Sequence, residues 1–378
     1  MPTYYEFFAG GGMVRAGLGD EWRCLLANDM SEKKALTYAE NWGGDEFITG
    51  DIHELSVADL PGQVDLAWGS FPCQDLSLAG AGAGLDGHRS GAFWGFWSLI
   101  QKLNSEGRKP RMVMLENVYG VLTSHGGKDV DAIAQALANE GYLFGVMVID
   151  AIHFVPQSRP RVFIFGVDAA MQVADSAHAW IANPAWHPAA VIRAHNRLPR
   201  KIQSRWRWWN PAVPEIVSST LEDLIEAEPR GVDWHSTEET AKLLSSMSDI
   251  NRRKVMLAQA DGKLRVGAVY RRTRDGIVRA EARFDGVSGC LRTPTGGSSR
   301  QTIIVVQGKQ VRSRLLSPRE AARLMGLPDS YRLPQRYNDA YHLAGDGVAV
   351  PVVKHLARNL FEPLLSAQRT NISSRRVA

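Results

Sequence analysis

Apolar runs and amphipathic stretches alternate through the first half of the chain. Residues 4–9 form a short apolar run that ends in three glycines, and residues 23–28 form a second run that ends at Asp29. Residues 64–69 and 112–115 are compact apolar runs typical of strands that are buried on both faces. Each run is followed by a stretch with helical periodicity. The alternation of strand and helix predicts an α/β fold with a doubly wound, mostly parallel sheet.

Two later runs predict a different connection. Residues 142–149 and 162–167 are strand-like and close together, and the loop between them contains Pro156 and Pro160. This spacing predicts an antiparallel hairpin at one edge of the sheet.

The regular alternation stops near residue 175, where Pro, Trp and Arg become frequent. Helical patterns return at Ser317-Pro318 and over about residues 351–360. We therefore expect two domains and a tail. Residues 1–180 and 306–365 would form the main domain, 181–305 a smaller domain, and 366–378 a disordered tail.

The net charge of +4 is unevenly distributed. Residues 181–310 contain 21 Lys and Arg against 13 Asp and Glu, a net of +8, so the rest of the chain carries −4. A basic segment beside a neutral-to-acidic body is expected of a nucleic-acid-binding domain next to a catalytic one. A merely solvated basic face would give the same count, and charge alone leaves both interpretations open.

The cysteines and the hydropathy bound the cellular setting. Cys24, Cys73 and Cys290 are widely spaced, which predicts neither a disulfide framework nor a metal site and favours a reducing compartment. No stretch of 18 apolar residues is present that would predict a transmembrane helix. The first six residues lack the pattern of a signal peptide. We expect a cytoplasmic monomer that does not bind a membrane or a metal.

Candidate ligand-binding residues follow the predicted strands, where open parallel sheets bind their ligands. Gly10 and Gly12 would let backbone amides approach a ligand closely. Asp29 and Asp51 end the second and third strands, where acids can bind ribose hydroxyls. The set suits an adenosine group held without a phosphate-binding lysine. Helix capping by the two aspartates is the alternative.

Four further residues carry groups that could react together. Cys73 follows the strand at 64–69, so its thiol would face the ligand cleft, although a lone cysteine is more often a small buried side chain. Glu116 stands at the same end of the next strand, which would bring it close to Cys73. Arg159 and Arg161 alternate where another strand begins, so we expect both to point to one face.

In order and spacing, these segments resemble the motifs of DNA cytosine C5-methyltransferases. The three catalytic motifs are matched at residues 71–74 (Phe-Pro-Cys-Gln), 116–118 (Glu-Asn-Val) and 157–161 (Gln-Ser-Arg-Pro-Arg). The glycine motif, the adenosine-binding strand ends and the late motif that supports the recognition domain are matched at residues 8–13, 28–30, 50–52 and 314–329. The resemblance covers about residues 4–175 and 288–360.

The resemblance implies a Rossmann-like methyltransferase fold that uses S-adenosyl-L-methionine, with residues 181–305 as a target-recognition domain. It implies that Cys73 adds to C6 of a flipped-out cytosine, that Glu116 hydrogen-bonds N3 and the exocyclic amine, and that Arg161 contacts O2. Arg159 would orient the thiol or the base. The implied cofactor-binding residues are Phe8, Ala9, Gly10, Gly12, Asp29, Met30, Asp51, Ile52, Pro72, Asp346 and Val348.

The implied macromolecular partner is double-stranded DNA, and the enzyme would then lie with the nucleoid. The expected DNA contacts are Gln74, Ser77, Arg205, Arg207, Arg271, Arg272, Arg274 and Arg300. The tryptophans at 206, 208 and 209 could instead form the core of the small domain, which we favour. A cognate restriction endonuclease would be a partner in function and not in a complex.

Two positions depart from the family pattern. Asp346 stands where the last motif usually has Asn, which puts the affinity for the cofactor in doubt, and Glu6 stands where Asp is commoner. Three alternatives stay open: an RNA cytosine methyltransferase, a weak or inactive DNA-binding relative, and a nicotinamide-dependent oxidoreductase. The first lacks its Cys-Phe-Thr signature here, the second would have lost Cys73 or Glu116, and the third would not need these residues together.

Overall fold

The computed structural model describes residues 1–72, 91–215, 219–274, 277–292 and 300–368. The chain divides into two compact units. The first unit comprises Met1–Asp150, Pro160–Pro214 and Val352–Ala378, and the second comprises Ala151–Arg159 and Glu215–Pro351. Residues 181–214 thus fold with the first unit and residues 306–351 with the second. These limits differ from the boundaries at 180 and 305 expected from the sequence.

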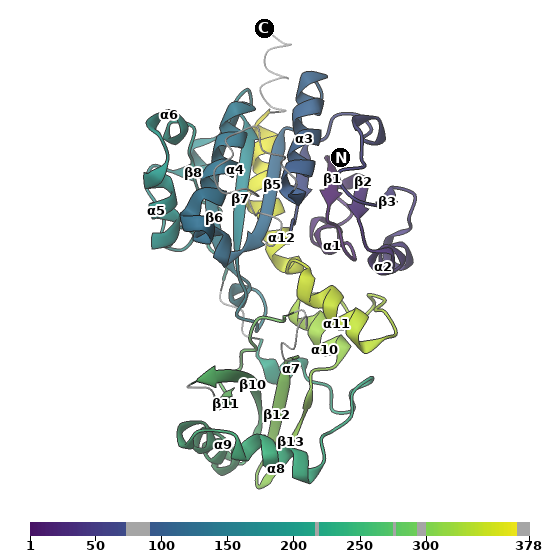
Figure 1. The fold of residues 1–378 in the computed structure, drawn as a ribbon, viewed down its shortest axis with the longest axis vertical. Coiled ribbons are helices and arrows are strands. Elements are labelled where there is room, and N and C mark those ends of the chain that lie inside the picture. Colours follow the sequence, from purple (N-terminus) through teal and green to yellow (C-terminus); the bar gives the residue numbers. More distant parts are fainter. Residues whose placement is uncertain (73–90, 216–218, 275–276, 293–299, 369–378) are drawn as a thin grey trace. The chain divides into compact units, whose positions relative to one another are not determined.

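One seven-stranded sheet forms the centre of the first unit (Figure 1). Its strands are β1 (Thr3–Phe7), β2 (Arg23–Asp29), β3 (Phe47–Thr49), β4 (Leu66–Gly69), β5 (Met112–Val118), β6 (Tyr142–Asp150) and β7 (Pro160–Asp168). They follow the order β3-β2-β1-β4-β5-β7-β6. The first five strands are parallel, and β7 is antiparallel to both β5 and β6. The predicted parallel sheet and edge hairpin are therefore confirmed.

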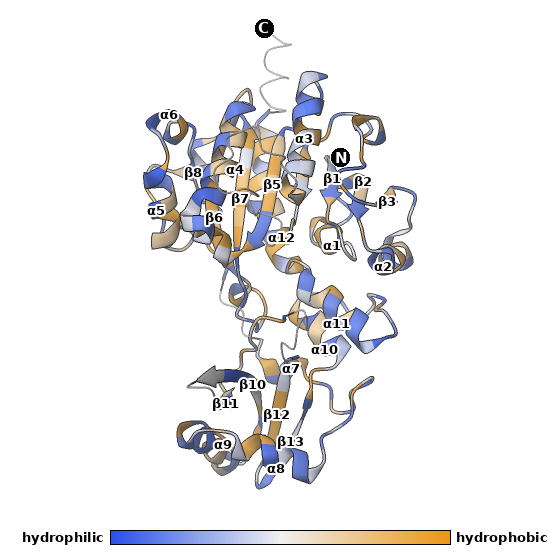
Figure 2. Cartoon of the chain, viewed as in Figure 1, coloured by the Kyte–Doolittle hydropathy of each residue, from blue (hydrophilic) through white to orange (hydrophobic). Residues whose placement is uncertain are grey.

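Helices cover both faces of this sheet (Figure 1). They are α1 (Met13–Leu18), α2 (Glu32–Trp42), α3 (Ala92–Ser105), α4 (Lys128–Asn139), α5 (Ala189–Arg197), α6 (Arg200–Gln203) and α12 (Val350–Leu356). Side chains alternate along each strand, so Phe7 packs against Phe96 of α3, with 5.2 Å between ring centroids. On the other face Trp68 and Phe165 contact Phe361, in the helix that continues α12. Burial on both faces explains why β5 and β7 are apolar over most of their length (Figure 2).

The predicted last helix is confirmed and is longer than expected. A π-helical turn at Ala357–Phe361 follows α12, and helix then continues to residue 368. Residues 366–368 of the expected tail are therefore helical, and the rest of that tail lies outside the described residues. No helix in the described part of the chain is both long and apolar enough to span a bilayer.

The tryptophans of the 201–209 segment belong to the core of the first unit. Two short strands, β8 (His178–Ala179) and β9 (Trp208–Trp209), pair there. Trp206 packs on Phe144, and Trp209 Nε1 donates to Phe165 O at 2.9 Å. A Cβ on Gly145 would clash with the Arg207 carbonyl, so glycine permits this close approach. The favoured interpretation as core is confirmed, but the core is not that of the small domain.

A four-stranded antiparallel sheet of order β11-β10-β12-β13 forms the second unit with its helices. The strands are β10 (Leu264–Arg274), β11 (Ile277–Arg283), β12 (Thr302–Gln307) and β13 (Gln310–Leu315). The helices are α7 (Leu221–Leu224), α8 (Thr237–Ser245), α9 (Asp249–Asp261), α10 (Pro318–Leu324) and α11 (Tyr337–Asp346). The side chains of α8 and α9 pack on Val269, Ile304 and Val306 of the sheet.

The start of α10 is the predicted one, and a buried ion pair holds it. Ser317 Oγ accepts from Glu320 N at 3.1 Å, and the Glu320 carboxylate accepts from Ser317 N at 2.7 Å. Arg314 donates to the two Glu320 oxygens at 2.7 and 2.6 Å, and both side chains are fully buried. Arg314 Nη2 also donates to Glu226 O, which joins α10 to the segment that follows α7.

We predict that Arg314→Ala lowers the free energy of unfolding by about 3–5 kcal/mol, because it leaves a buried carboxylate without its cation. Urea unfolding of the full chain measures this loss. Arg323 pairs with the exposed Asp329 at 2.7 Å, so Arg323→Ala is the control and should stay within about 1 kcal/mol of wild type. Equal losses of unfolding free energy in the two variants would show that the buried Arg314–Glu320 pair stabilises the fold no more than the exposed pair does.

Candidate functional site

The carboxyl ends of β4 and β5 lie side by side in the first unit. Gly69 pairs with Leu115 in parallel register, so the chain that leaves β4 emerges beside the end of β5. Asn117 Nδ2 donates to Phe71 O at 2.9 Å, and this bond is buried. This bond holds Phe71, two residues before Cys73, next to Asn117, the residue that follows Glu116. Cys73 itself lies outside the described residues, as do Gln74 and Ser77.

Glu116 and Arg161 form an ion pair at the carboxyl end of β5. Glu116 is 6% exposed, and its Oε1 lies 3.3 Å from Arg161 Nε. Because β7 runs antiparallel to β5, the beginning of β7 lies at the carboxyl end of β5, and Arg161 pairs there with Val118. The structure therefore brings these two predicted site residues together.

Arg159 does not share this position. β7 begins at Pro160, so Arg159 precedes the strand and folds with the second unit. Its guanidinium donates to the carbonyl oxygens of Leu291, Gly345 and Gly347. The expectation that Arg159 and Arg161 point to one face of a strand is wrong, because only Arg161 lies on the strand.

The glycine loop after β1 has the backbone of a close-approach turn. Phe8 has φ +59°, which is rare for a residue with a side chain, and Gly10 and Gly12 also have positive φ. A Cβ on Gly12 would lie 2.9 Å from Tyr38 Cε2 and closer still to the Trp42 ring. Only glycine therefore fits between this loop and α2.

Asp29 stabilises that loop from the end of β2. Its Oδ2 accepts from Gly10 N at 3.0 Å, and its Oδ1 accepts from Ser31 N at 2.9 Å. The N-cap of α2 is Ser31, so the capping alternative does not describe Asp29. Each carboxylate oxygen has a further lone pair, which leaves acceptor capacity for a ligand hydroxyl.

The other predicted cofactor residues of the first unit differ in exposure. Met30 is 75% exposed, and Asp51 and Pro72 are also exposed. Ala9 and Ile52 are buried. The exposed side chains are accessible to a ligand, whereas Ala9 and Ile52 pack into the interior of the unit.

Glu6 is a buried acid on β1, behind the glycine loop. Burial raises the pKa of Glu6 to about 8. The amides of Val14 and Arg15 and the charge of Arg15 lower that pKa in part, although neither amide forms a hydrogen bond of ordinary geometry. The sequence marked Glu6 only as a departure from a motif; its burial depends on the packing of α1.

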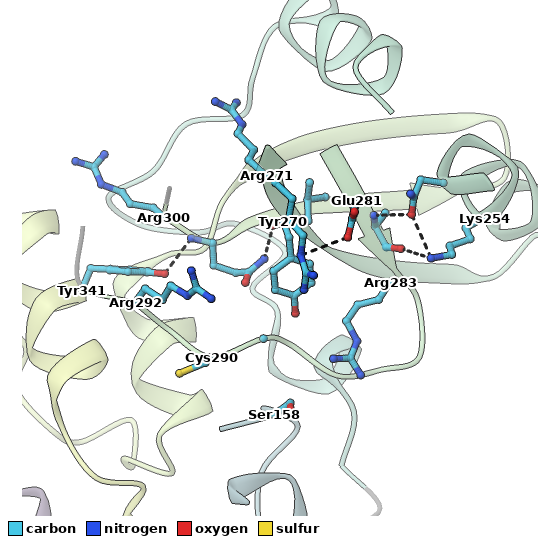
Figure 3. Close-up of a pocket in the computed structure, with 16 residues that line it drawn as sticks. Ser158, Lys254, Tyr270, Arg271, Glu281, Arg283, Cys290, Arg292, Arg300 and Tyr341 are labelled. Carbon is cyan, nitrogen blue, oxygen red and sulfur yellow. Dashed lines mark hydrogen bonds and ion pairs between the residues drawn. The ribbon is translucent and has the colours of Figure 1, made fainter. Parts of the chain in front are cut away.

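A cavity of about 600 Å³ in the second unit is lined mainly by cationic side chains among its charged residues (Figure 3). Its charged lining consists of Lys254, Arg271, Arg272, Arg283, Arg292, Arg300 and one acid, Glu281. Arg272 lies 3.4 Å from Glu281, and Arg283 pairs with Asp285. Within the described residues no ion pair involves Arg271, Arg292 or Arg300. The cavity is therefore strongly electropositive.

The chain matches the profile of the C-5 cytosine-specific DNA methylase family over residues 3–362. The chain belongs to this family. Type II methyltransferase M.BsuFI of Bacillus subtilis is 26% identical over 368 residues, 97% of this chain and 74% of that protein. Type II methyltransferase M.NlaX of Neisseria lactamica is also 26% identical, over 94% of this chain and 95% of its own length.

Two solved structures share the fold of this DNA methylase. The S. pombe Dnmt2 methyltransferase superposes with a TM-score of 0.59 at 19% identity, over 96% of this chain and 99% of its own. A mutant of Spodoptera frugiperda DNMT2 superposes with a TM-score of 0.61 at 16% identity, over 95% and 99%. The predicted methyltransferase fold is confirmed, and at these identities the likeness concerns the fold alone.

The arginines expected to contact DNA are distributed over both units of this methylase. Arg271, Arg272 and Arg300 line the cavity, while the side chain of Arg274 lies outside the described residues. Arg205 and Arg207 fold with the first unit, and Arg207 Nη1 donates to the carbonyls of Ser204 and Trp206. Sequence reasoning missed three further cavity cations, Lys254, Arg283 and Arg292, although all three lie in the basic 181–310 segment.

The last family motif lies in the second unit. Asp346 ends α11 and is exposed, whereas Val348 is buried. The departure from the usual Asn therefore places a charged side chain at the end of a helix, where its carboxylate meets the negative end of the helix dipole.

We predict that Glu6 makes this methylase less stable as pH rises. The folded protein holds the Glu6 proton up to pH about 8, whereas the unfolded chain releases it near 4.5. Stability should therefore fall relative to Glu6→Gln between these values, by at most about 1.4 kcal/mol per pH unit, and level off above them. Urea unfolding of both proteins at pH 5, 7 and 9 measures the difference. A difference that does not change with pH would contradict the prediction.

Proposed function

We propose that this protein transfers a methyl group from S-adenosyl-L-methionine to C5 of a flipped-out cytosine in double-stranded DNA, through a covalent bond between Cys73 and C6. The observation that carries the proposal is the buried bond from Asn117 to Phe71 O. It fixes the chain just before Cys73 at the edge where Glu116 and Arg161 pair. A thiol, a carboxylate and a guanidinium at one strand edge are the groups that this chemistry needs.

The first unit fits an adenosine-containing cofactor. The glycine loop turns tightly, with positive φ at Phe8, Gly10 and Gly12, and Asp29 keeps acceptor capacity beside it. Phe8, Ala9, Gly10, Gly12, Asp29, Met30, Asp51, Ile52 and Pro72 are the residues assigned to it there. Asp346 and Val348, on the second unit, are assigned to its methionine end by resemblance. When bound, the cofactor supplies an electrophilic methyl group on a sulfonium.

The residues of the chain would activate the base in a defined order. Cys73, as the thiolate, adds to C6, which places electron density on C5. Glu116 hydrogen-bonds N3 and the exocyclic amine, while Arg161 contacts O2 and holds the Glu116 carboxylate. C5 then takes the methyl group, which would leave the sulfur of the cofactor as a neutral thioether. Water accepts the C5 proton, the bond between sulfur and C6 breaks, and Cys73 returns as the thiolate. Because C6 is inaccessible inside a duplex, the base must leave the stack.

The second unit would supply the DNA-binding surface. Arg271, Arg292 and Arg300 line the electropositive cavity and take part in no ion pair within the described residues, so they can neutralise phosphates. Arg272, beside Glu281, is a weaker candidate. We assign residues 181–305 to target recognition from the basic charge of this segment and from the resemblance, although residues 181–214 fold with the first unit. Arg205, Arg207 and Arg274, and Gln74 and Ser77 near the target base, are proposed as further contacts.

The cellular role follows from the same relatives. Both are named as Type II methyltransferases, so we propose that this enzyme also modifies the sites of a restriction–modification system. It would act as a cytoplasmic monomer on nucleoid DNA, with any endonuclease as a functional counterpart and not as a bound subunit.

We predict that Cys73→Ser abolishes methyl transfer while DNA and cofactor binding persist, because a hydroxyl is a far weaker nucleophile toward C6. Transfer of labelled methyl groups to DNA measures the loss. With S-adenosyl-L-methionine present, a duplex with 5-fluorocytosine at the target should trap wild-type enzyme in a denaturation-resistant adduct, because fluorine blocks the final elimination. Mass spectrometry should locate the adduct on Cys73. Near-normal turnover by Cys73→Ser, or an adduct on another residue, would exclude the mechanism.

We predict that combining Arg271→Gln, Arg292→Gln and Arg300→Gln weakens DNA binding and flattens its salt dependence. Each lost phosphate contact should reduce the slope of log K against log salt by about 0.9. Titrations at several salt concentrations measure this slope.

Arg265 is the matched control for these variants. It lies on the same strand as Arg271, does not line the cavity and is paired with Asp261. Arg265→Gln should therefore bind DNA like wild type. An unchanged slope in the triple variant would mean that the cavity arginines form a solvated face.

A further inference from the structure

Arg159 is buried in the second unit, where it is 2% exposed. Its Nη2 donates to Gly345 O at 2.8 Å and to Gly347 O at 2.7 Å. Its Nη1 donates to Leu291 O at 3.2 Å and lies 3.4 Å from Cys290 Sγ. One guanidinium thus connects the end of α11 to a segment far from it in the sequence.

The end of α11 has a physical need for such a donor. The last carbonyls of a helix lack partners within it, and they form the negative end of the helix dipole. Gly345 O belongs to the last turn of α11, and Gly347 is its C-cap. A planar guanidinium can donate to both and to Leu291 O at once, whereas the ammonium of a lysine is a compact point charge.

We propose that Arg159 is a positioning residue that holds the loop at Gly345, Asp346 and Gly347, and that it does not act on the cytosine or the thiol. The inference rests on the proposed function, because Asp346 and Val348 are the residues assigned there to the methionine end of the cofactor. Arg159 then acts on methyl transfer through the cofactor.

Gln157 offers a matched control on the same segment. Its Nε2 donates to Leu324 O at 2.7 Å, and its Oε1 accepts from Leu291 N at 3.1 Å. Gln157 is fully buried and supports the same neighbourhood, but none of these hydrogen bonds reaches the loop after α11. A variant at Gln157 should therefore lower stability without freeing the loop.

The test compares Arg159→Gln, Arg159→Lys and Gln157→Ala with wild type in the full chain. Calorimetry measures S-adenosyl-L-methionine binding without DNA, hydrogen exchange reports residues 337–350, and steady-state kinetics separates kcat from the KM for the cofactor. We expect Arg159→Gln to weaken cofactor binding and raise KM by about tenfold or more, with kcat at saturating cofactor within about threefold of wild type. Exchange at 337–350 should accelerate. Arg159→Lys should be intermediate, and Gln157→Ala should lower Tm with unchanged cofactor affinity.

Two results would overturn the proposal. A large fall in kcat with unchanged cofactor affinity would mean that Arg159 contacts the reacting groups. Equal losses of cofactor affinity in Gln157→Ala and Arg159→Gln would mean that general destabilisation is the cause. If Arg159→Gln does not fold, Arg159→Lys decides, and unchanged affinity and exchange in that variant count against the proposal. Wild-type protein that binds no S-adenosyl-L-methionine would instead exclude the proposed function, while the exchange comparison would still test the position of the loop.

Discussion

Arg161 reaches Glu116 because β7 runs against β5. In a sheet whose strands were all parallel, every strand would begin at the end of the sheet opposite to the carboxyl ends, where ligands bind. The reversal of β7 brings its first residues to the carboxyl end of β5, where Arg161 lies 3.3 Å from Glu116. Asn117, the next residue on β5, holds Phe71 O at the same edge. The position of the candidate site thus depends on one antiparallel pairing.

The five residues from Gln157 to Arg161 form contacts within two different units of the chain. Gln157 and Arg159 bind backbone groups of the second unit, whereas Arg161 binds a carboxylate of the first. The chain passes from one unit to the other between residues 159 and 160. A motif that is compact in sequence can therefore serve both units, with buried hydrogen bonds on one side and an ion pair on the other. Such bonds are costly to break, because the carbonyls they satisfy are buried with them.

Ion pairing determines how much each arginine of the second unit contributes to the electrostatic potential. β10 carries both Arg265 and Arg271, but only Arg265 is paired, with Asp261. Arg283 pairs with Asp285, and Arg272 lies beside Glu281. A paired arginine contributes less to the local potential than its formal charge suggests, because the acid offsets it. The remaining arginines make the potential of the cavity positive, and they are fewer than the basic residues counted in the whole segment.

The sequence by itself determined the features that depend on neighbouring residues. The apolar runs located the central strands, and Pro156 marked the link of the hairpin, whose second strand begins at Pro160. Ser317-Pro318 marked the start of α10, because periodicity and capping act over a few positions. The motifs also indicated the family, which the match over residues 3–362 established.

Only the tertiary structure decided which strand β7 would pair with, which unit the tryptophans at 206 and 209 would join, and where Arg159 would point. These outcomes depend on hydrogen bonds and burial between segments far apart in the chain. No local pattern encodes such pairings, so two arginines separated by one proline could not be assigned different partners from the sequence alone.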